Sequence, residues 1–185
     1  MEQKRIGIIG SGSWATAIAK IVTDNGHPIT WWVRQQANID YFVKRKHNQH
    51  YLRNAYFNVQ QLSFSTDIQW VVAQADILII AVPSIHIEST LAGLDAADLK
   101  GKIIISAVKG VLPKHNILLN QYLAEKFNIP CHAEYKSAIY SAAWCVDINA
   151  ILLQKRNDFI GQYNGSGYIA EVSLYRLFKV GGYSL

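Results

Sequence analysis

Residues 5–16 read RIGIIGSGSWAT, a short apolar run that breaks into a glycine-rich turn and continues into helix-favouring residues. The continuous apolar run predicts a buried parallel strand, because helices cover both faces of such a strand. Gly10, Gly12 and Ala15 then occupy the three small-residue positions of the G-x-G-x-x-G/A fingerprint. The stretch therefore predicts a strand, a turn and a helix of the kind that holds a dinucleotide.

Each small residue of this stretch has a mechanical reason. Gly10 permits the tight turn out of the strand, Gly12 leaves room for a pyrophosphate near the backbone, and Ala15 lets the helix lie close to the sheet. The N–H groups and the positive dipole end of that helix would face the phosphates. The alternative is a turn with a purely structural role. The strand before the turn and the helical pattern after it favour cofactor binding.

Length and composition indicate a folded domain with one sizeable core and room for a small appendage. Half of the 185 residues are hydrophobic and 17% are charged, which favours a folded domain over a disordered chain. The net charge of +5 suits an anionic ligand such as a nucleotide. The positive residues are scattered along the chain, so no nucleic-acid partner is expected.

The two cysteines, Cys131 and Cys145, are too few for a disulfide framework, and their spacing matches no common zinc pattern. We therefore expect no metal site and a reduced, cytoplasmic setting. No secretory signal precedes the first strand. The longest apolar stretch, Ile77 to Val82, is far too short to span a bilayer, so no membrane insertion is expected.

The residue that follows the second strand bears on the choice of cofactor. A helical pattern ends at Asn25-Gly26, and Ile29 to Val33 then reads as a strand. An acidic residue at the end of that strand would bind the ribose hydroxyls of NAD, whereas an arginine accommodates the extra phosphate of NADP. This chain has Arg34 there, which allows NADP. The alternative is a solvent-exposed arginine without a ligand.

Strands and helices alternate along the rest of the first 130 residues. This alternation predicts an α/β fold of the Rossmann type, doubly wound around a mostly parallel sheet. Thr66 or Asp67 is expected to cap one of the helices. The further expected strands are Leu62 to Ser65, Asp76 to Val82 and Gly101 to Ala107, and the further expected helices are residues 38–46, 67–73, 85–94 and 115–127.

Two later positions should lie at the same carboxyl edge as the glycine turn, because ligands of open parallel sheets bind beyond the strand ends. Ser84 follows the strand Asp76 to Val82 and either caps the next helix or contacts the cofactor. Lys109 follows the strand Gly101 to Ala107. It is a candidate to bind an anionic substrate or the nicotinamide end of the cofactor, with a solvated loop lysine as the alternative.

Four ordered motifs resemble one family. They are GSGSWATA at residues 10–17, WWVR at 31–34, ADILIIAVPS at 75–84 and SAVKG at 106–110. Together they are similar to the bacterial type of NAD(P)-dependent glycerol-3-phosphate dehydrogenase. The resemblance implies a Rossmann cofactor domain, residues 1–130 in this chain, followed by a helical substrate domain. It also implies NAD or NADP as cofactor and interconversion of dihydroxyacetone phosphate and sn-glycerol 3-phosphate for phospholipid biosynthesis.

The resemblance also implies roles for individual residues. Ser13 and Trp14 match cofactor contacts, and Arg34 matches the contact on the adenosine side. Lys109 matches a residue shared by cofactor and substrate. In the segment PCHAE at residues 130–134, Cys131 matches a substrate contact and Ala133 a cofactor contact.

The resemblance ends at about residue 134, so the chain is expected to be truncated or altered there relative to the family. The L-K-N segment that carries the family's acid/base lysine is not found, which leaves the catalytic residue unassigned and predicts weak or absent turnover. Residues 131–185 form a divergent segment expected to pack weakly against the sheet, with helices in 138–153 and 169–178.

Two other functions stay open. One is a non-catalytic NAD(P)-binding module, and the other is a different reductase that shares the same cofactor domain. The oligomeric state is also open, with a homodimer as one option.

Overall fold

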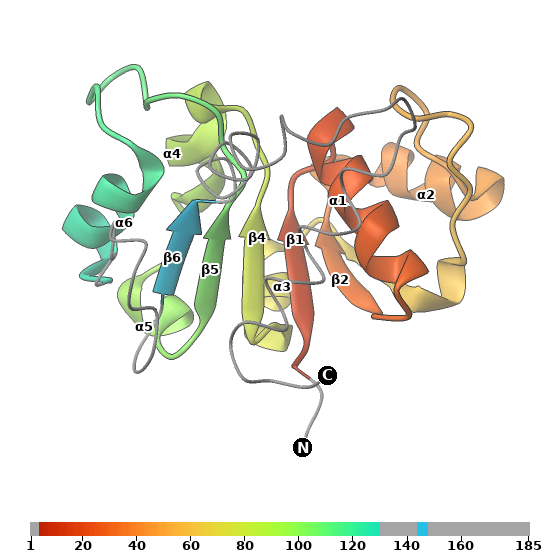
Figure 1. The fold of residues 1–185 in the computed structure, drawn as a ribbon, viewed down its shortest axis with the longest axis horizontal. Helices are drawn as coiled ribbons and strands as arrows, with labels where there is room; N and C mark the ends of the chain where they lie inside the picture. The colour runs from red at the N-terminus through yellow and green to blue at the C-terminus, as the bar shows by residue number, and fades with distance from the viewer. Residues whose placement is uncertain (1–3, 130–143, 148–185) are drawn as a thin grey trace, which may run out of the picture.

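The computed structural model describes residues 4–129 and the backbone of residues 144–147. Its centre is a six-stranded sheet in the order β3-β2-β1-β4-β5-β6, and every neighbouring pair of strands is parallel (Figure 1). This is the strand order of a doubly wound dinucleotide-binding sheet. The predicted fold class is therefore confirmed.

The strands are short and in matched register. Their bounds are β1 Ile6–Ile9, β2 Ile29–Trp32, β3 Leu62–Ser65, β4 Ile77–Ile80, β5 Ile103–Ser106 and β6 Trp144–Asp147. Ile6 pairs with Ile29 on one side and with Ile77 on the other. The winding direction of the sheet reverses between β1 and β4, and such a switch point opens a crevice beyond the carboxyl ends of the strands.

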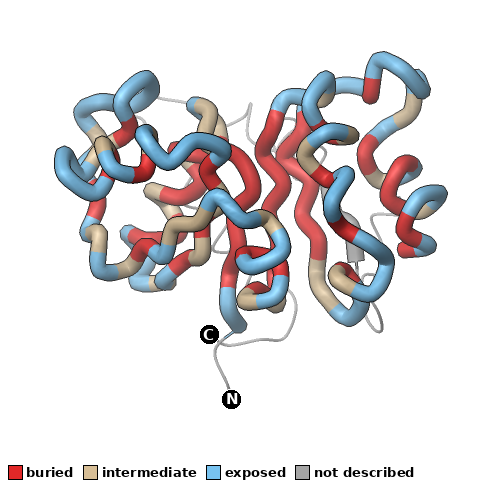
Figure 2. The backbone as a smooth tube through the Cα atoms, turned by 180° about the vertical axis from the view of Figure 1, so that it is seen from behind, coloured by how far each residue is buried: buried red, intermediate tan, exposed pale blue. Residues whose placement is uncertain are grey.

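Helices cover both faces of the sheet, and Figure 2 shows the buried strands between them. Their bounds are α1 Ser13–Asp24, α2 Gln36–Arg45, α3 Ile68–Gln74, α4 Ile87–Leu91, α5 Ala96–Leu99 and α6 Leu119–Phe127, with short 3-10 turns η1 Val59–Gln61 and η2 Ser84–His86. Two apolar clusters form the core. One surrounds Ile8 and Trp31, and the other surrounds Leu78 and Ile104. Burial of each such side chain contributes about 2 kcal/mol of hydrophobic free energy.

The local sequence signals were right at some element ends and wrong at others. Asp67 caps α3 as predicted, because its carboxylate accepts hydrogen bonds from the N–H groups of Gln69 and Trp70 at 2.9 and 3.3 Å. Ser84 caps no helix. It is the first residue of η2, whose N-cap is Pro83, and Pro83 makes no side-chain capping hydrogen bond.

The helix expected over residues 115–127 begins later, at Leu119. The residues before it turn back on themselves, since the Leu112 N–H donates to the Ile117 carbonyl at 2.8 Å in an antiparallel bridge. Asn116, with a φ of 54°, supplies the left-handed residue of that turn. A local pairing therefore replaces the first helical turn that the apolar spacing suggested.

The prediction of a helix within residues 138–153 is wrong for residues 144–147. Those residues form β6 and pair in parallel with β5, with Ile103 opposite Trp144. The remainder of that stretch and the helix expected at 169–178 lie outside the described residues. The apolar run thus provides a sixth strand, which an apolar pattern of this length also allows.

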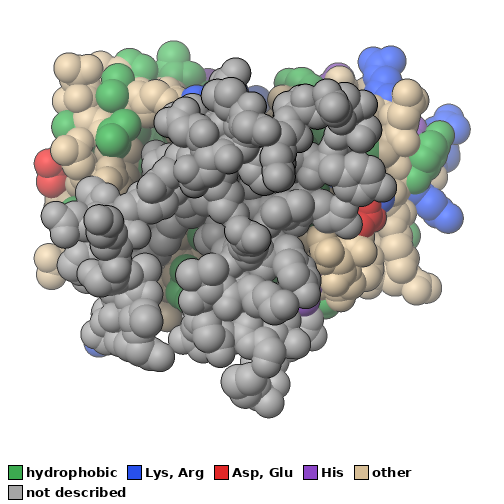
Figure 3. Space-filling view, viewed as in Figure 1, with side chains coloured by type: hydrophobic (Ala, Val, Ile, Leu, Met, Phe, Trp, Pro, Cys, Tyr) green, Lys and Arg blue, Asp and Glu red, His purple; other side chains and the backbone are tan. Residues whose placement is uncertain are grey.

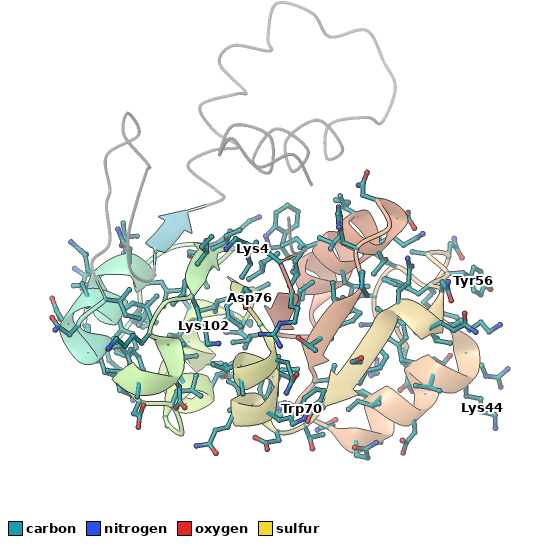
Figure 4. The ribbon with its side chains drawn as sticks, turned by 90° about the horizontal axis from the view of Figure 1, so that it is seen from below. Lys4, Lys44, Tyr56, Trp70, Asp76 and Lys102 are labelled. Atoms are coloured by element: carbon teal, nitrogen blue, oxygen red, sulfur yellow. The ribbon has the colours of Figure 1, made fainter. Side chains whose placement is uncertain are left out.

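The amino-terminal edge of the sheet carries a group of charges on the side opposite the crevice. Asp76 binds Arg5 through its carboxylate at 3.2 Å, and Figure 4 shows Asp76 with Lys4 and Lys102 near it. The hydrogen bond from the Arg5 side chain is the main cause that lowers the pKa of Asp76. Partial burial lowers the pKa of Lys102, whose amine donates to the Ala75 carbonyl at 2.7 Å. These contacts join the chain segments that lead into β1, β4 and β5.

The basic residues at the end of α2 lie in solvent. Lys44, Arg45 and Lys46 are all exposed, and Lys46 ends the helix with a left-handed φ of 62°. Lys and Arg side chains gather at this end of the molecule in Figure 3. In the part of the chain that the structure describes, no helix combines the length and apolar character needed to cross a bilayer.

Candidate functional site

A cleft of about 340 Å³ lies at the carboxyl edge of the sheet, above the switch point between β1 and β4. Residues 10–12 form its floor, and residues 31–35 follow from β2. One wall is residues 48–51, and the opposite wall is residues 81–83 together with His86. Four chain segments that are distant in sequence therefore meet where the fold predicts a ligand.

Gly10 is required by its surroundings. Its φ is 121°, a conformation that side-chain-bearing residues rarely adopt. A Cβ at this position would lie 2.4 Å from the Ala81 carbonyl oxygen and 3.0 Å from a methyl group of Val82. The turn thus passes directly against the end of β4, and only glycine fits there.

No contact among the described residues requires glycine at position 12. The φ of Gly12, −76°, is open to any residue, and a Cβ there would meet no described atom within 4 Å apart from its chain neighbours. Gly12 is also the N-cap of α1, and no side chain caps that helix end. The first N–H groups of a helix have no partner inside the helix. The structure thus leaves free space and free donors at one place, which is the requirement for a bound diphosphate.

Arg34 lies exposed at the end of β2 and lines the same cleft. His50 and His86 line it from the two walls, and no carboxylate is present among the described residues that form it. The side chains around the cleft are therefore neutral or cationic, which suits an anionic ligand.

The structure brings Gly10, Gly12 and Arg34 together in the cleft and leaves three other predicted residues outside its lining. Ser13 is exposed in the first turn of α1. Trp14 packs against the core, and its Nε1 atom is buried without a hydrogen-bond partner among the described residues. Lys109 is exposed just after β5. Cys131 and Ala133 lie outside the described residues.

Two site residues were missed by the sequence analysis. Asn48 is buried, and its side-chain amide bonds to the Ser11 carbonyl and the Thr16 hydroxyl. The Trp31 indole N–H donates to the Gly10 carbonyl at 2.6 Å. Trp31 was assigned to a strand and to the WWVR motif, and Asn48 was given no role. No local pattern marks either contact, because the partners are 21 and 37 residues apart.

The described residues contain no group of three or more His, Cys, Asp or Glu side chains placed to hold a metal ion. The site therefore offers backbone donors, an arginine and an open cleft as its means of binding.

The doubly wound parallel sheet, with its cleft above a glycine turn and an uncapped helix, defines a dinucleotide-binding domain. Comparison with known families identifies it further. The model of the NAD-dependent glycerol-3-phosphate dehydrogenase N-terminus matches residues 5–135, and the chain belongs to this family. Membership indicates NAD or NADP as the cofactor of the fold and confirms the resemblance drawn from the motifs.

Individual relatives agree with this assignment. Glycerol-3-phosphate dehydrogenase [NAD(P)+] of Agathobacter rectalis is 32% identical over 127 residues, which are 69% of this chain and 37% of the relative. The enzyme of the same name from a Thermoanaerobacter species is 31% identical over 137 residues, and the match covers 70% of this chain and 41% of the relative. The chain thus spans little more than a third of the length of the curated relatives that it matches.

Solved structures show the same fold. Glycerol-3-phosphate dehydrogenase of Plasmodium falciparum superposes with a TM-score of 0.59 at 30% identity, over 69% of this chain and 39% of that one. The Coxiella burnetii protein of the same name gives a TM-score of 0.63 over 96% of this chain and 69% of its own. Its identity is 18%, so this likeness supports the fold alone.

Proposed function

We propose that the chain binds NADPH or NADH in the cleft and serves as the cofactor domain for interconversion of dihydroxyacetone phosphate and sn-glycerol 3-phosphate. The single observation that carries the proposal is the open N-terminus of α1 at Gly12. It offers uncapped N–H donors at the floor of a cleft whose described lining residues include no carboxylate. The substrates come from the names of the relatives, all of which are longer than this chain.

The residues present fit a dinucleotide. Its diphosphate would lie against residues 10–13, where no described side chain fills the space over Gly12 and the helix dipole is favourable. Its adenosine end would lie toward Arg34, at the end of β2, where the ribose 2′ position is recognised. A guanidinium at that position pairs with a 2′-phosphate, which supports NADPH over NADH.

When bound, the nicotinamide supplies the hydride of a ketone reduction. The groups of this chain bind the diphosphate, orient the ring and exclude water at the strand ends. We propose that Lys109, at the carboxyl end of β5, contacts substrate and cofactor. Ser13, Trp14 and Ala133 are proposed cofactor contacts, and Cys131 is a proposed substrate contact. No acid/base residue is assigned, and we expect weak or absent turnover from this chain.

Calorimetric titration of the purified 185-residue chain with NADPH and NADH tests the binding step. The oxidation of NADPH with dihydroxyacetone phosphate, followed at 340 nm, then tests the reaction. Binding with oxidation that depends on this substrate supports the full proposal. Binding without oxidation supports the non-catalytic module, and oxidation with a different keto substrate supports another reductase. Failure to bind either cofactor refutes the proposal altogether.

The proposal also includes a cytoplasmic protein without membrane insertion and without a nucleic-acid partner, with a homodimer as one option. Light scattering of the eluted protein measures its oligomeric state. Limited proteolysis with and without NADPH tests the division at residue 130. We expect the cofactor to slow cleavage within residues 1–130.

A further inference from the structure

The three successive carbonyls of the glycine turn, residues 10–12, are each held by a different side chain. Trp31 Nε1 donates to the first at 2.6 Å, Asn48 Nδ2 to the second at 3.2 Å and the Thr16 hydroxyl to the third at 2.8 Å. All three donors are buried. The carbonyl oxygens, which would repel an anion, are therefore turned toward the interior.

The same contacts decide where the N–H groups of the turn point. In a trans peptide unit the C=O of one residue and the N–H of the next point in opposite directions. If the carbonyls of residues 10–12 face the interior, the N–H groups of residues 11–13 face away from it, toward the cleft. No described residue accepts a hydrogen bond from those N–H groups. The three side chains thus aim a row of donors at the site of the diphosphate.

Asn48 differs from the other two donors because it comes from outside the β1-α1-β2 unit. Its Nδ2 atom also donates to the Thr16 hydroxyl at 2.9 Å, while its Oδ1 atom accepts from the N–H groups of His50 and Tyr51 at 2.9 and 3.2 Å. Backbone N–H groups only donate, so these two bonds identify the oxygen end of the amide. Every hydrogen-bonding position that orients this side chain is filled.

We propose that Asn48 is a positioning residue for the diphosphate-binding turn. It holds the peptide unit between Ser11 and Gly12 with its N–H toward the cleft, and it joins that turn to the wall formed by residues 49–51. Asn48 acts through the turn, because both polar atoms of its amide bond to groups of the chain itself. The inference rests on the proposed binding of a dinucleotide in the cleft.

The test is the affinity of Asn48→Ala for NADPH, measured by calorimetry at a temperature where circular dichroism shows the variant fully folded. We expect binding about tenfold weaker than wild type, the change that corresponds to one net hydrogen bond. Asn58→Ala is the matched control. The Asn58 side chain accepts from the Gln60 N–H at 3.2 Å in the same connection and does not contact the turn. The control should stay within about twofold of wild type.

A second ligand separates the turn from the wall. Adenosine 2′-monophosphate lacks the diphosphate, so its affinity should change much less in Asn48→Ala than the affinity of NADPH. Equal losses for both ligands would mean that Asn48 acts only through residues 49–51, and unchanged NADPH affinity in the folded variant would also overturn the proposal.

A third variant keeps the test open if Asn48→Ala does not fold. Thr16→Val, which is near in shape, removes the hydroxyl that joins Asn48 to the Gly12 carbonyl and should weaken NADPH binding severalfold. Unchanged binding in this variant counts against the proposal. Wild-type protein that does not bind NADPH refutes the proposed function instead, so the two failures are distinguishable.

Discussion

Exchange of the first two glycines of the turn for alanine should separate folding from ligand binding. Gly10→Ala places a methyl group 2.4 Å from the Ala81 carbonyl oxygen in a residue whose φ is 121°. An unfavourable φ contributes about 1–3 kcal/mol and overpacking against the backbone about the same. The expected loss of unfolding free energy is therefore about 2–6 kcal/mol, a large part of the stability of an ordinary domain.

Urea unfolding followed by tryptophan fluorescence measures this loss. For an m-value of about 2 kcal/mol per molar, a loss of about 3 kcal/mol lowers the midpoint by about 1.5 M. Gly12→Ala is the matched control, because the φ of −76° suits alanine and no described residue would contact the added methyl group. Its unfolding free energy should change by less than about 0.5 kcal/mol.

For ligand binding we expect the larger effect from Gly12→Ala, the variant that should change stability less. The methyl group of Gly12→Ala would occupy the space proposed for the diphosphate, so its NADPH affinity should fall by about tenfold or more, measured by calorimetry on the folded protein. The reasoning is refuted if Gly10→Ala unfolds at the wild-type urea concentration. It is equally refuted if Gly12→Ala binds NADPH as tightly as wild type.

Three further predictions concern the cofactor choice, the sheet edge and the core. Arg34→Ala should weaken NADPH binding by about tenfold and NADH binding by less than about threefold, and equal effects in calorimetry would remove Arg34 from 2′-phosphate recognition. Asp76→Asn should lower the unfolding free energy at pH 7 by less than about 1 kcal/mol, because the pair with Arg5 is partly exposed. The pKa of Asp76 in the folded protein is lowered from its ordinary value of 3.8. The stabilisation by this pair is therefore complete above the pKa of Asp76 in the unfolded chain. Urea curves should show the difference between wild type and variant vanish as the pH falls through the pKa of Asp76 in the folded protein. Trp31→Phe keeps a ring in the core but leaves the Gly10 carbonyl without its donor, so urea unfolding should show a loss of about 2 kcal/mol, and an unchanged midpoint would mean that this hydrogen bond contributes little.

Much of the fold could be predicted because its signals are local. The apolar run before Gly10 and the small residues at Gly12 and Ala15 lie within one dozen positions and specify β1, the turn and the start of α1. Asp67 is a cap that acts on the two residues just after it. Element ends were less predictable. The role of Ser84 and the first residue of α6 depend on how neighbouring residues pair, and the spacing of apolar residues does not predict that pairing.

The candidate site was predicted only in part. Gly10, Gly12 and Arg34 follow strand ends, and strand ends meet at one edge of a parallel sheet, so their convergence could be predicted. The contribution of Asn48 could not. It lies 37 residues from Ser11 and 32 from Thr16 in a connection without periodicity, and only the folded chain brings its amide to both.

The sequence by itself determined the first five strands, the glycine turn and the family, because these depend on residue types at fixed short spacings. The tertiary structure alone decided which glycine is required by the fold and which leaves room for a ligand. It also decided which buried side chains turn the carbonyls of that turn inward. Such choices arise from contacts between segments tens of residues apart, and these contacts exist only once the sheet has assembled.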